Sequence, residues 1–257
     1  MEQYSVLQKF DPVTDYFKEP YPHIIIKDCL PLAVYENLYE NFPVQEVKQN
    51  FNLVEGHTYR GLANDFIRSK RVVAKQCWLD FFEFHTSQQY YNQVLKIFKE
   101  DLKENAWLTN ENVKVRHSEG NTRIVTDTQF VIHEPIKAGT TRTSHIDNPL
   151  EIYAGLLYMR QRGDKAKGGD FVIYDTPQID KVIEKTGRQI PKSFGELKEN
   201  KTINYKENTF VMFLNSNKSV HGVTPRQDPG HDRLSINIIA EIEKKTNPLF
   251  TLTEIAE

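Results

Sequence analysis

The sequence has few cysteines and no long hydrophobic run, and both shortages narrow the class of protein. Of 257 residues two are cysteines, Cys29 and Cys77, and neither belongs to a C-x-x-C pair. Disulfide frameworks and zinc ribbons need more cysteines at closer spacing, so we expect a reducing compartment. The apolar stretches are too short to cross a membrane. The start, "MEQYSVLQKFDPVTDYF", has no basic segment followed by an apolar one, so we expect no signal peptide and a cytoplasmic location.

An excess of charge of one sign is also missing. The chain has 33 Lys and Arg against 35 Asp and Glu, a formal net charge of −2. Without a basic field to hold phosphates, we expect neither a nucleic-acid nor a membrane partner. Hydrophobic residues make up 39% and charged residues 26%, which indicates a folded globular protein rather than a disordered one.

The first part of the chain, residues 1–118, carries mostly helical patterns. Residues 30–43 have Pro31 near the start and apolar residues four apart, which predicts a helix. Residues 74–104 show apolar and aromatic residues at helical spacing, and we interpret them as two helices. An exception is "HIIIK", residues 23–27, which reads as a short buried strand.

From residue 122 the period of the apolar residues changes to two, the spacing of β-strands. Five segments follow it: "NTRIVTDTQFVIHEP", "EIYAGLLYMRQ", "GGDFVIYDT", "NTFVMFLNSN" and "DRLSINIIAEI". Between the third and fourth lies a polar, Lys-rich stretch, 175–206, which we interpret as a surface excursion, a lid or a partly helical insertion. We predict an α+β fold of one domain, 1–257, with a β-sandwich or barrel core at 119–243, helices buttressing it, and a tail at 244–257.

A histidine and an aspartate stand two residues apart just before the second of these strands. In an extended segment, His145 and Asp147 would point to the same side. The spacing alone is weak evidence, because a chain with 8 His and 35 acids yields roughly one such pair by chance. His117 and Glu119 form a second pair before a turn, and we interpret that pair as solvated surface.

Further polar residues follow the fourth strand and lie on the fifth. His221 comes after "TFVMFLN" in a segment of turn residues. On the fifth strand Arg233, Ser235 and Asn237 share one face, and apolar residues take the other. That polar face is either exposed to solvent or the wall of a pocket. Arg226 lies in the loop "TPRQDPG", and we interpret it as solvated.

These residue types suit a metal and a small diacid. Two neutral imidazoles and one carboxylate on one face of an octahedron are typical of Fe(II) sites that leave positions open for O₂ and a co-substrate. The guanidinium of Arg233, with the hydroxyl of Ser235 beside it, is a natural partner for a carboxylate. A hypothesis follows in which the metal binds one end of a dicarboxylate and the arginine binds the other.

Over about residues 120–242 the chain resembles the Fe(II)/2-oxoglutarate-dependent dioxygenases. The matching motifs are His145-x-Asp147, His221, Arg233-x-Ser235 and "GGDFVIY", whose glycine pair opens a strand of the double-stranded β-helix (jelly-roll or cupin-like fold) in this family. "SHIDNP" and "GLLYM" resemble the prolyl-hydroxylase branch most, and Tyr158 matches a tyrosine that contacts the co-substrate there.

The resemblance implies a site and a reaction. Fe(II) would be bound by His145, Asp147 and His221, and 2-oxoglutarate by Arg233 and Ser235 with help from Tyr158 and Asn237. O₂ would be consumed, succinate and CO₂ released, and ascorbate is a candidate reductant. Because halogenases of the family replace the carboxylate ligand, Asp147 favours hydroxylation.

The substrate is less clearly indicated. Where the prolyl-hydroxylase branch often has a tyrosine, this chain has His133, which shares a strand face with Arg123 and Gln129. If that face turns inward, these three residues would contact the substrate; otherwise it is an exposed sheet surface. We favour hydroxylation of a small molecule such as an amino acid or a derivative. The alternatives are a prolyl or other residue of a protein, a non-catalytic cupin-like binding module, and a zinc hydrolase.

Overall fold

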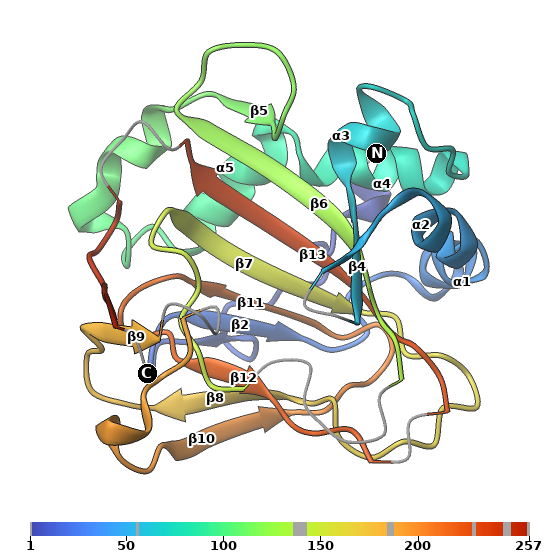
Figure 1. Cartoon of the computed structure of the whole chain (residues 1–257). Helices are drawn as coiled ribbons and strands as arrows, with labels where there is room; N and C mark the ends of the chain where they lie inside the picture. The colour runs from blue at the N-terminus through green and yellow to red at the C-terminus, as the bar shows by residue number, and fades with distance from the viewer. Residues whose placement is uncertain are drawn as a thin grey trace.

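In the computed structural model the described residues are 2–54, 57–135, 143–183, 188–227, 230–243 and 248–255. Two β-sheets face each other in them and form a double-stranded β-helix, with α-helices on the outer side of the larger sheet (Figure 1). The predicted fold class is therefore confirmed. No helix of these ranges is both long and apolar enough to traverse a lipid bilayer.

The larger sheet is mainly antiparallel and carries the longest strands. Its members are β1 (Tyr16–Phe17), β2 (His23–Ile26), β3 (Leu53–Val54), β4 (Thr58–Leu62), β5 (Val113–Val115), β6 (Ile124–His133), β7 (Glu151–Tyr158), β11 (Phe210–Leu214) and β13 (Arg233–Ile242). The order is β1-β2-β11-β7-β13-β6-β4-β3, and β5 pairs with β6.

The smaller sheet has the order β10-β8-β12. Its strands are β8 (Phe171–Asp175), β10 (Lys198–Ile203) and β12 (His221–Val223), and a separate pair joins β9 (Lys181–Ile183) to β14 (Thr253–Ile255). The five predicted core strands are present as β6, β7, β8, β11 and β13. The sequence did not predict β10 or β12.

All α-helices of the described residues lie in the first part of the chain, as predicted. They are α1 (Leu32–Glu40), α2 (Val44–Asn50), α3 (Ala63–Ile67), α4 (Gln76–His85) and α5 (Gln88–Ile97), and short 3-10 helices cover Glu2–Tyr4, Lys103–Asn110 and Lys192–Phe194. The expected break within 74–104 falls before α5, where the Ser87 hydroxyl accepts a hydrogen bond from the Tyr90 amide at 3.2 Å. The description of residues 1–118 as helix-rich is incomplete, because β2 and β4 flank the core strands of the larger sheet.

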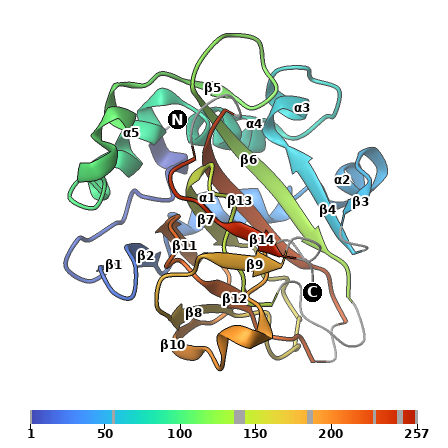
Figure 2. The same ribbon diagram turned by 60° about the vertical axis from the view of Figure 1, so that its left-hand side comes forward.

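The helices pack against one face of β6 and β13, and this contact holds the main core (Figure 2). Ile236 and Ile238 of β13 point into it, together with Phe130 of β6, whose ring lies 4.8 Å from that of Trp78 on α4. Alternation along a strand sends the odd-numbered residues of β13 to the opposite face, toward the smaller sheet. The predicted division of β13 into an apolar and a polar face is confirmed.

The stretch 175–206 is part of the barrel wall, so its interpretation as a surface excursion or a lid is wrong for the residues described. Strand β10 pairs with β8 from Lys198 to Ile203. Ile179 and Val182 are buried in a cluster with Ile146 and Val220. Residues 184–187 of this stretch lie outside the described residues.

Candidate metal and co-substrate site

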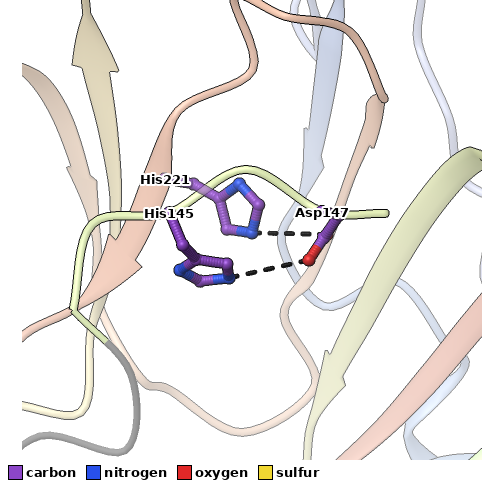
Figure 3. A group of neighbouring side chains, drawn as sticks. All are labelled: His145, Asp147 and His221. Carbon is purple, nitrogen blue, oxygen red and sulfur yellow. Dashed lines mark ion pairs between the residues drawn. The ribbon is translucent and has the colours of Figure 1, made fainter. Parts of the chain in front are cut away.

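The three candidate metal ligands converge on one point between the two sheets. Their ligand atoms all lie within 4.8 Å of one another, and all three side chains are buried. Nε2 of His145 is 3.6 Å from Oδ1 of Asp147, and Nε2 of His221 is 3.4 Å from Oδ2 (Figure 3). Residues 74 positions apart in the chain thus present two imidazoles and one carboxylate to a shared space.

Backbone pairing brings the two histidines together. The amide of His145 donates to the carbonyl of His221 at 2.8 Å, and the amide of His221 donates back at 3.1 Å. Gly222 allows this approach, because a Cβ there would lie 3.2 Å from the backbone nitrogen of Ser144. The main-chain hydrogen bonds therefore hold His145 and His221 next to each other without a metal.

Each imidazole is also held in one tautomer. Nδ1 of His145 lies 2.7 Å from the carbonyl oxygen of Thr143, and Nδ1 of His221 lies 2.8 Å from that of Ser219. A carbonyl only accepts, so each Nδ1 carries the proton and each Nε2 keeps its lone pair for a metal. The Phe171 ring stacks on His221 at 5.2 Å. The donor set and its orientation fit Fe(II) with open coordination positions.

Arg233 lines the same pocket and is fully buried, with 1% of its surface exposed. Its Nε donates to the carbonyl of Gly169 at 3.1 Å. Its Nη2 and the Ser235 hydroxyl oxygen are buried and have no hydrogen-bond partner among the described residues. An unpaired buried donor is costly, so a carboxylate ligand would supply what both groups lack.

The predicted helpers Tyr158 and Asn237 lie next to these groups. Tyr158 faces Ser235 across the β7–β13 pairing, and its ring centre is 5.3 Å from the guanidinium carbon of Arg233. Burial raises the pKa of the Tyr158 hydroxyl, against the opposing effect of Arg233, so the group stays a neutral donor. The Asn237 side-chain oxygen is a further buried atom with no partner in the described ranges.

The glycine pair before β8 is needed to seat the arginine. Gly168 and Gly169 both have φ of +80°, which favours glycine. A Cβ on Gly169 would lie 3.1 Å from Cγ of Arg226 and 3.4 Å from Nε of Arg233. The pair therefore lets the chain pass close to both arginines.

The pocket has a volume of about 300 Å³. It is lined by the three metal-ligand candidates, by Arg233, Ser235 and Asn237, and also by Gln129 and His133. Among the three candidate substrate residues, only Gln129 and His133 line it. Arg123 lies elsewhere, with Nη1 2.8 Å from a Glu111 carboxylate oxygen and the guanidinium 4.3 Å above the Trp107 ring centre.

His133 takes a defined place beside Arg233. The two residues are directly paired across β6 and β13, and Nδ1 of His133 lies 2.8 Å from the Thr58 hydroxyl. Burial, together with the charges of Arg233 and Arg60, lowers the pKa of His133 well below its usual value. The imidazole is therefore neutral and can accept or donate one hydrogen bond in the pocket.

Arg226 is not solvated, and this interpretation from the sequence is wrong. It is 7% exposed, with Nη2 2.8 Å from a carboxylate oxygen of Asp164 and Nη1 donating to the carbonyl of His231 at 2.9 Å. Asp164 comes from a distant loop, so the loop composition around Arg226 gave no sign of the ion pair. His117 and Glu119 are exposed, as predicted.

Among the described residues, the sequence analysis missed four charged residues that line the pocket: Arg60, Arg116, Glu151 and Arg188. Burial raises the pKa of Glu151 to about 8, as do the nearby charges of Asp147 and Glu241, against the opposing effects of Arg116 and Arg188. The one available signal was Glu151, the charged first residue of a predicted strand only four positions after Asp147.

Comparison with known protein families gives one match. Residues 128–240 match the model of the 2OG-Fe(II) oxygenase superfamily. The matched range contains His145, Asp147, His221 and Arg233. No curated protein matches the chain.

Solved structures similar to this chain include three prolyl hydroxylases. A prolyl 4-hydroxylase from Phytophthora capsici has 16% identity and a TM-score of 0.46, over 86% of this chain and 59% of that one. One from Pseudomonas putida has 14% identity and a TM-score of 0.44, over 94% and 99%. One from Trichoplax adhaerens, in complex with a hypoxia inducible factor peptide fragment, has 10% identity and a TM-score of 0.46, over 87% and 84%. The chain thus covers less than two thirds of the first of these proteins.

Proposed function

We propose that this chain, whose residues 128–240 match the model of the 2OG-Fe(II) oxygenase superfamily, is an enzyme of that superfamily and hydroxylates an unactivated C–H bond of a small molecule such as an amino acid or a derivative. The superfamily uses Fe(II), 2-oxoglutarate and O₂, and enzymes of this kind are dioxygenases. One observation carries the assignment of the site: the His145, Asp147 and His221 ligand atoms converge in the pocket that holds the unpaired groups of Arg233 and Ser235.

Each residue has a role that follows from its contacts. His145 and His221 would bind Fe(II) through Nε2, and Asp147 through a carboxylate oxygen. When bound, the iron couples oxidative decarboxylation of 2-oxoglutarate to succinate and CO₂ with oxidation of a substrate C–H bond. Arg233 and Ser235 would bind the distal carboxylate of 2-oxoglutarate, and neutral His133 and Tyr158 would add hydrogen bonds around it. The buried walls exclude water from the reacting groups.

The pocket volume supports a small substrate. About 300 Å³ lies at the low end for small-molecule sites, and 2-oxoglutarate must occupy part of it. A prolyl or other residue of a protein is the second candidate, because "SHIDNP" and the position of Tyr158 resemble the prolyl-hydroxylase branch.

The test is succinate formation from 2-oxoglutarate in air with added Fe(II), measured with the purified chain and with three variants. We expect slow turnover even without substrate, lost in His145→Ala and in Asp147→Ala. His117→Ala is the matched control, since His117 belongs to the same H-x-acid spacing but is exposed, and it should keep the wild-type rate.

The result also separates the rival classes. A non-catalytic binding module would form no succinate with any variant, and a zinc hydrolase would act without O₂. Equal rates in His145→Ala and His117→Ala would refute the ligand assignment.

A further inference from the structure

Two of the candidate metal ligands, His145 and Asp147, come from one extended segment, and His221 comes from the neighbouring β12 (Figure 3). Ile146 separates the first two. Alternation along the segment points its side chain away from the metal position, into a buried apolar cluster that also contains Val220. The main chain of Ile146 links the two ligands, so a contact that holds this main chain positions both of them.

Residues 188–190 pair with this segment on the side opposite β12. The pairing is antiparallel and sets His145 opposite Gln189. The amide of Ile146 donates to the carbonyl of Arg188 at 3.2 Å. In a regular antiparallel ladder two such residues exchange both hydrogen bonds, so the return bond would run from the Arg188 amide to the Ile146 carbonyl.

The return bond comes from a side chain instead. The Arg188 amide donates to the carbonyl of Ile183 at 3.2 Å, so it does not serve Ile146. Nε of Arg188 donates to the Ile146 carbonyl at 3.2 Å. Arg188 thus bonds both main-chain polar groups of Ile146, one through its own carbonyl and the other through its guanidinium.

The backbone of Arg188 has a conformation that arginine rarely adopts. Its φ is +64°, in the left-handed region that favours glycine. A glycine at this position would fit the backbone but would remove the Nε donor to the Ile146 carbonyl. The arginine at a position suited to glycine therefore indicates that its side chain has a role.

The residues around Arg188 are held by main-chain pairing. The amide of Ile183 donates to the carbonyl of Gln189 at 2.9 Å, and β9, which contains Ile183, pairs with β14. The side chain of Arg188 therefore starts from a fixed backbone, and it lines the pocket that contains the metal ligands.

We propose that Arg188 is a positioning residue of the metal site, which fixes the main chain between His145 and Asp147 through its hydrogen bond to the Ile146 carbonyl. This inference rests on the proposed function and adds a residue to its metal site. Arg188 acts through Ile146 and does not bind the metal. Residues that orient metal ligands in this way typically contribute about 10- to 100-fold to metal affinity.

The test compares Arg188→Met with Arg188→Gln. Both changes remove the charge, but glutamine has an amide nitrogen at the chain position of Nε, where methionine has a methyl group. Mn(II) is titrated into the metal-free full chain, and free Mn(II) is measured by electron paramagnetic resonance. We expect the dissociation constant for Mn(II) to rise at least about ten-fold in Arg188→Met. In Arg188→Gln it should be at least about five-fold lower than in Arg188→Met, the effect of one neutral hydrogen bond.

Arg123→Met is the matched control, because Arg123 lies outside the pocket on Glu111 and Trp107, and it should bind Mn(II) like the wild type. Thermal unfolding of each metal-free variant verifies that it is folded. If Arg188→Met does not fold, Arg188→Gly decides in its place, since glycine suits φ of +64°; it should also weaken Mn(II) binding at least about ten-fold.

Two results would overturn the role of Arg188: a smaller loss of Mn(II) affinity in the variant without the side-chain donor, or equal affinities in Arg188→Gln and Arg188→Met. The second result would assign the effect to charge or packing rather than to the hydrogen bond. An error in the proposed function gives a different outcome, because the wild type would then bind Mn(II) no more tightly than His145→Ala.

Discussion

Replacing Arg233 by glutamine should weaken binding of 2-oxoglutarate far more than the same change at Arg226. Both arginines are buried, and both contact the Gly168–Gly169 segment. They differ in whether a guanidinium nitrogen remains available to bind a ligand. Arg226 already uses Nη1 and Nη2 on His231 and Asp164, whereas Nη2 of Arg233 has no partner among the described residues.

The magnitude follows from the hydrogen bonds lost. A charge-assisted bond contributes about 1.5–3 kcal/mol, and the guanidinium fork can make two to a carboxylate, while glutamine keeps one neutral donor. A net loss of about 2–4 kcal/mol corresponds to a KM for 2-oxoglutarate raised roughly 30- to 1,000-fold. Arg233→Lys keeps the charge but not the two-pronged guanidinium, so its KM for 2-oxoglutarate should lie between those of the wild type and Arg233→Gln.

The assay is succinate formation over a range of 2-oxoglutarate concentrations at fixed Fe(II), with thermal unfolding of each variant measured alongside. Arg226→Gln should lower the melting temperature, since it leaves Asp164 buried and unpaired, but should change KM by only a few-fold. The reasoning is refuted if Arg226→Gln raises KM as much as Arg233→Gln, or if Arg233→Gln binds 2-oxoglutarate like the wild type.

Three further predictions concern the glycine pair, a buried histidine and the metal. Gly169→Ala should raise KM for 2-oxoglutarate about ten-fold or more, because alanine is strained at φ +80° and would shift the Gly169 carbonyl that accepts a hydrogen bond from Nε of Arg233; an unchanged KM would contradict this. The pKa of His85 is lowered by burial from 6.5 to about 3, so the unfolded chain alone takes up a proton as pH falls below 6.5. His85 alone should therefore lower the free energy of unfolding by about 2 kcal/mol between pH 7.5 and pH 5, so in denaturant titrations the decrease over this range should be about 2 kcal/mol smaller in His85→Gln than in the wild type. Mn(II) at a hundred times its dissociation constant should stabilise the wild type by about 2.7 kcal/mol, and a comparable shift in His221→Ala would exclude His221 as a ligand.

The sequence predicted those parts of the fold in which a single local pattern determines which way the side chains point. Ile236 and Ile238 alternate with Ser235 and Asn237, and a period of two has only one reading on a strand with one face against helices. The same alternation put Arg233 on the polar face, which the sequence left as either exposed to solvent or the wall of a pocket, and the structure shows that it lines the pocket. The two pairs have the same spacing, and it was the strand pattern after His145 and Asp147, absent after His117 and Glu119, that separated the buried pair from the exposed one.

The parts that were missed depend on partners that are distant in the chain. Strand β12 is three residues long, and only its pairing with β8 makes it a strand. Arg226 reads as solvated until Asp164 is brought beside it. Glu151 was missed because the β7–β13 register shifts between Ala240 and Glu241. Simple alternation from Tyr158 would send position 151 to the helix side, whereas this irregularity turns it into the pocket.

The pocket contains like charges and unpaired polar atoms that destabilise the folded state unless ligands are bound. Asp147 and Glu151 raise each other's electrostatic energy, and Arg233 and Ser235 leave buried polar atoms unpaired. Such groups would be replaced at little cost if they served the fold alone. A metal ion next to Asp147 and a diacid on Arg233 and Ser235 would satisfy these groups together. Binding of either should therefore strengthen binding of the other, because each removes a charge or an unpaired donor that the next would otherwise meet.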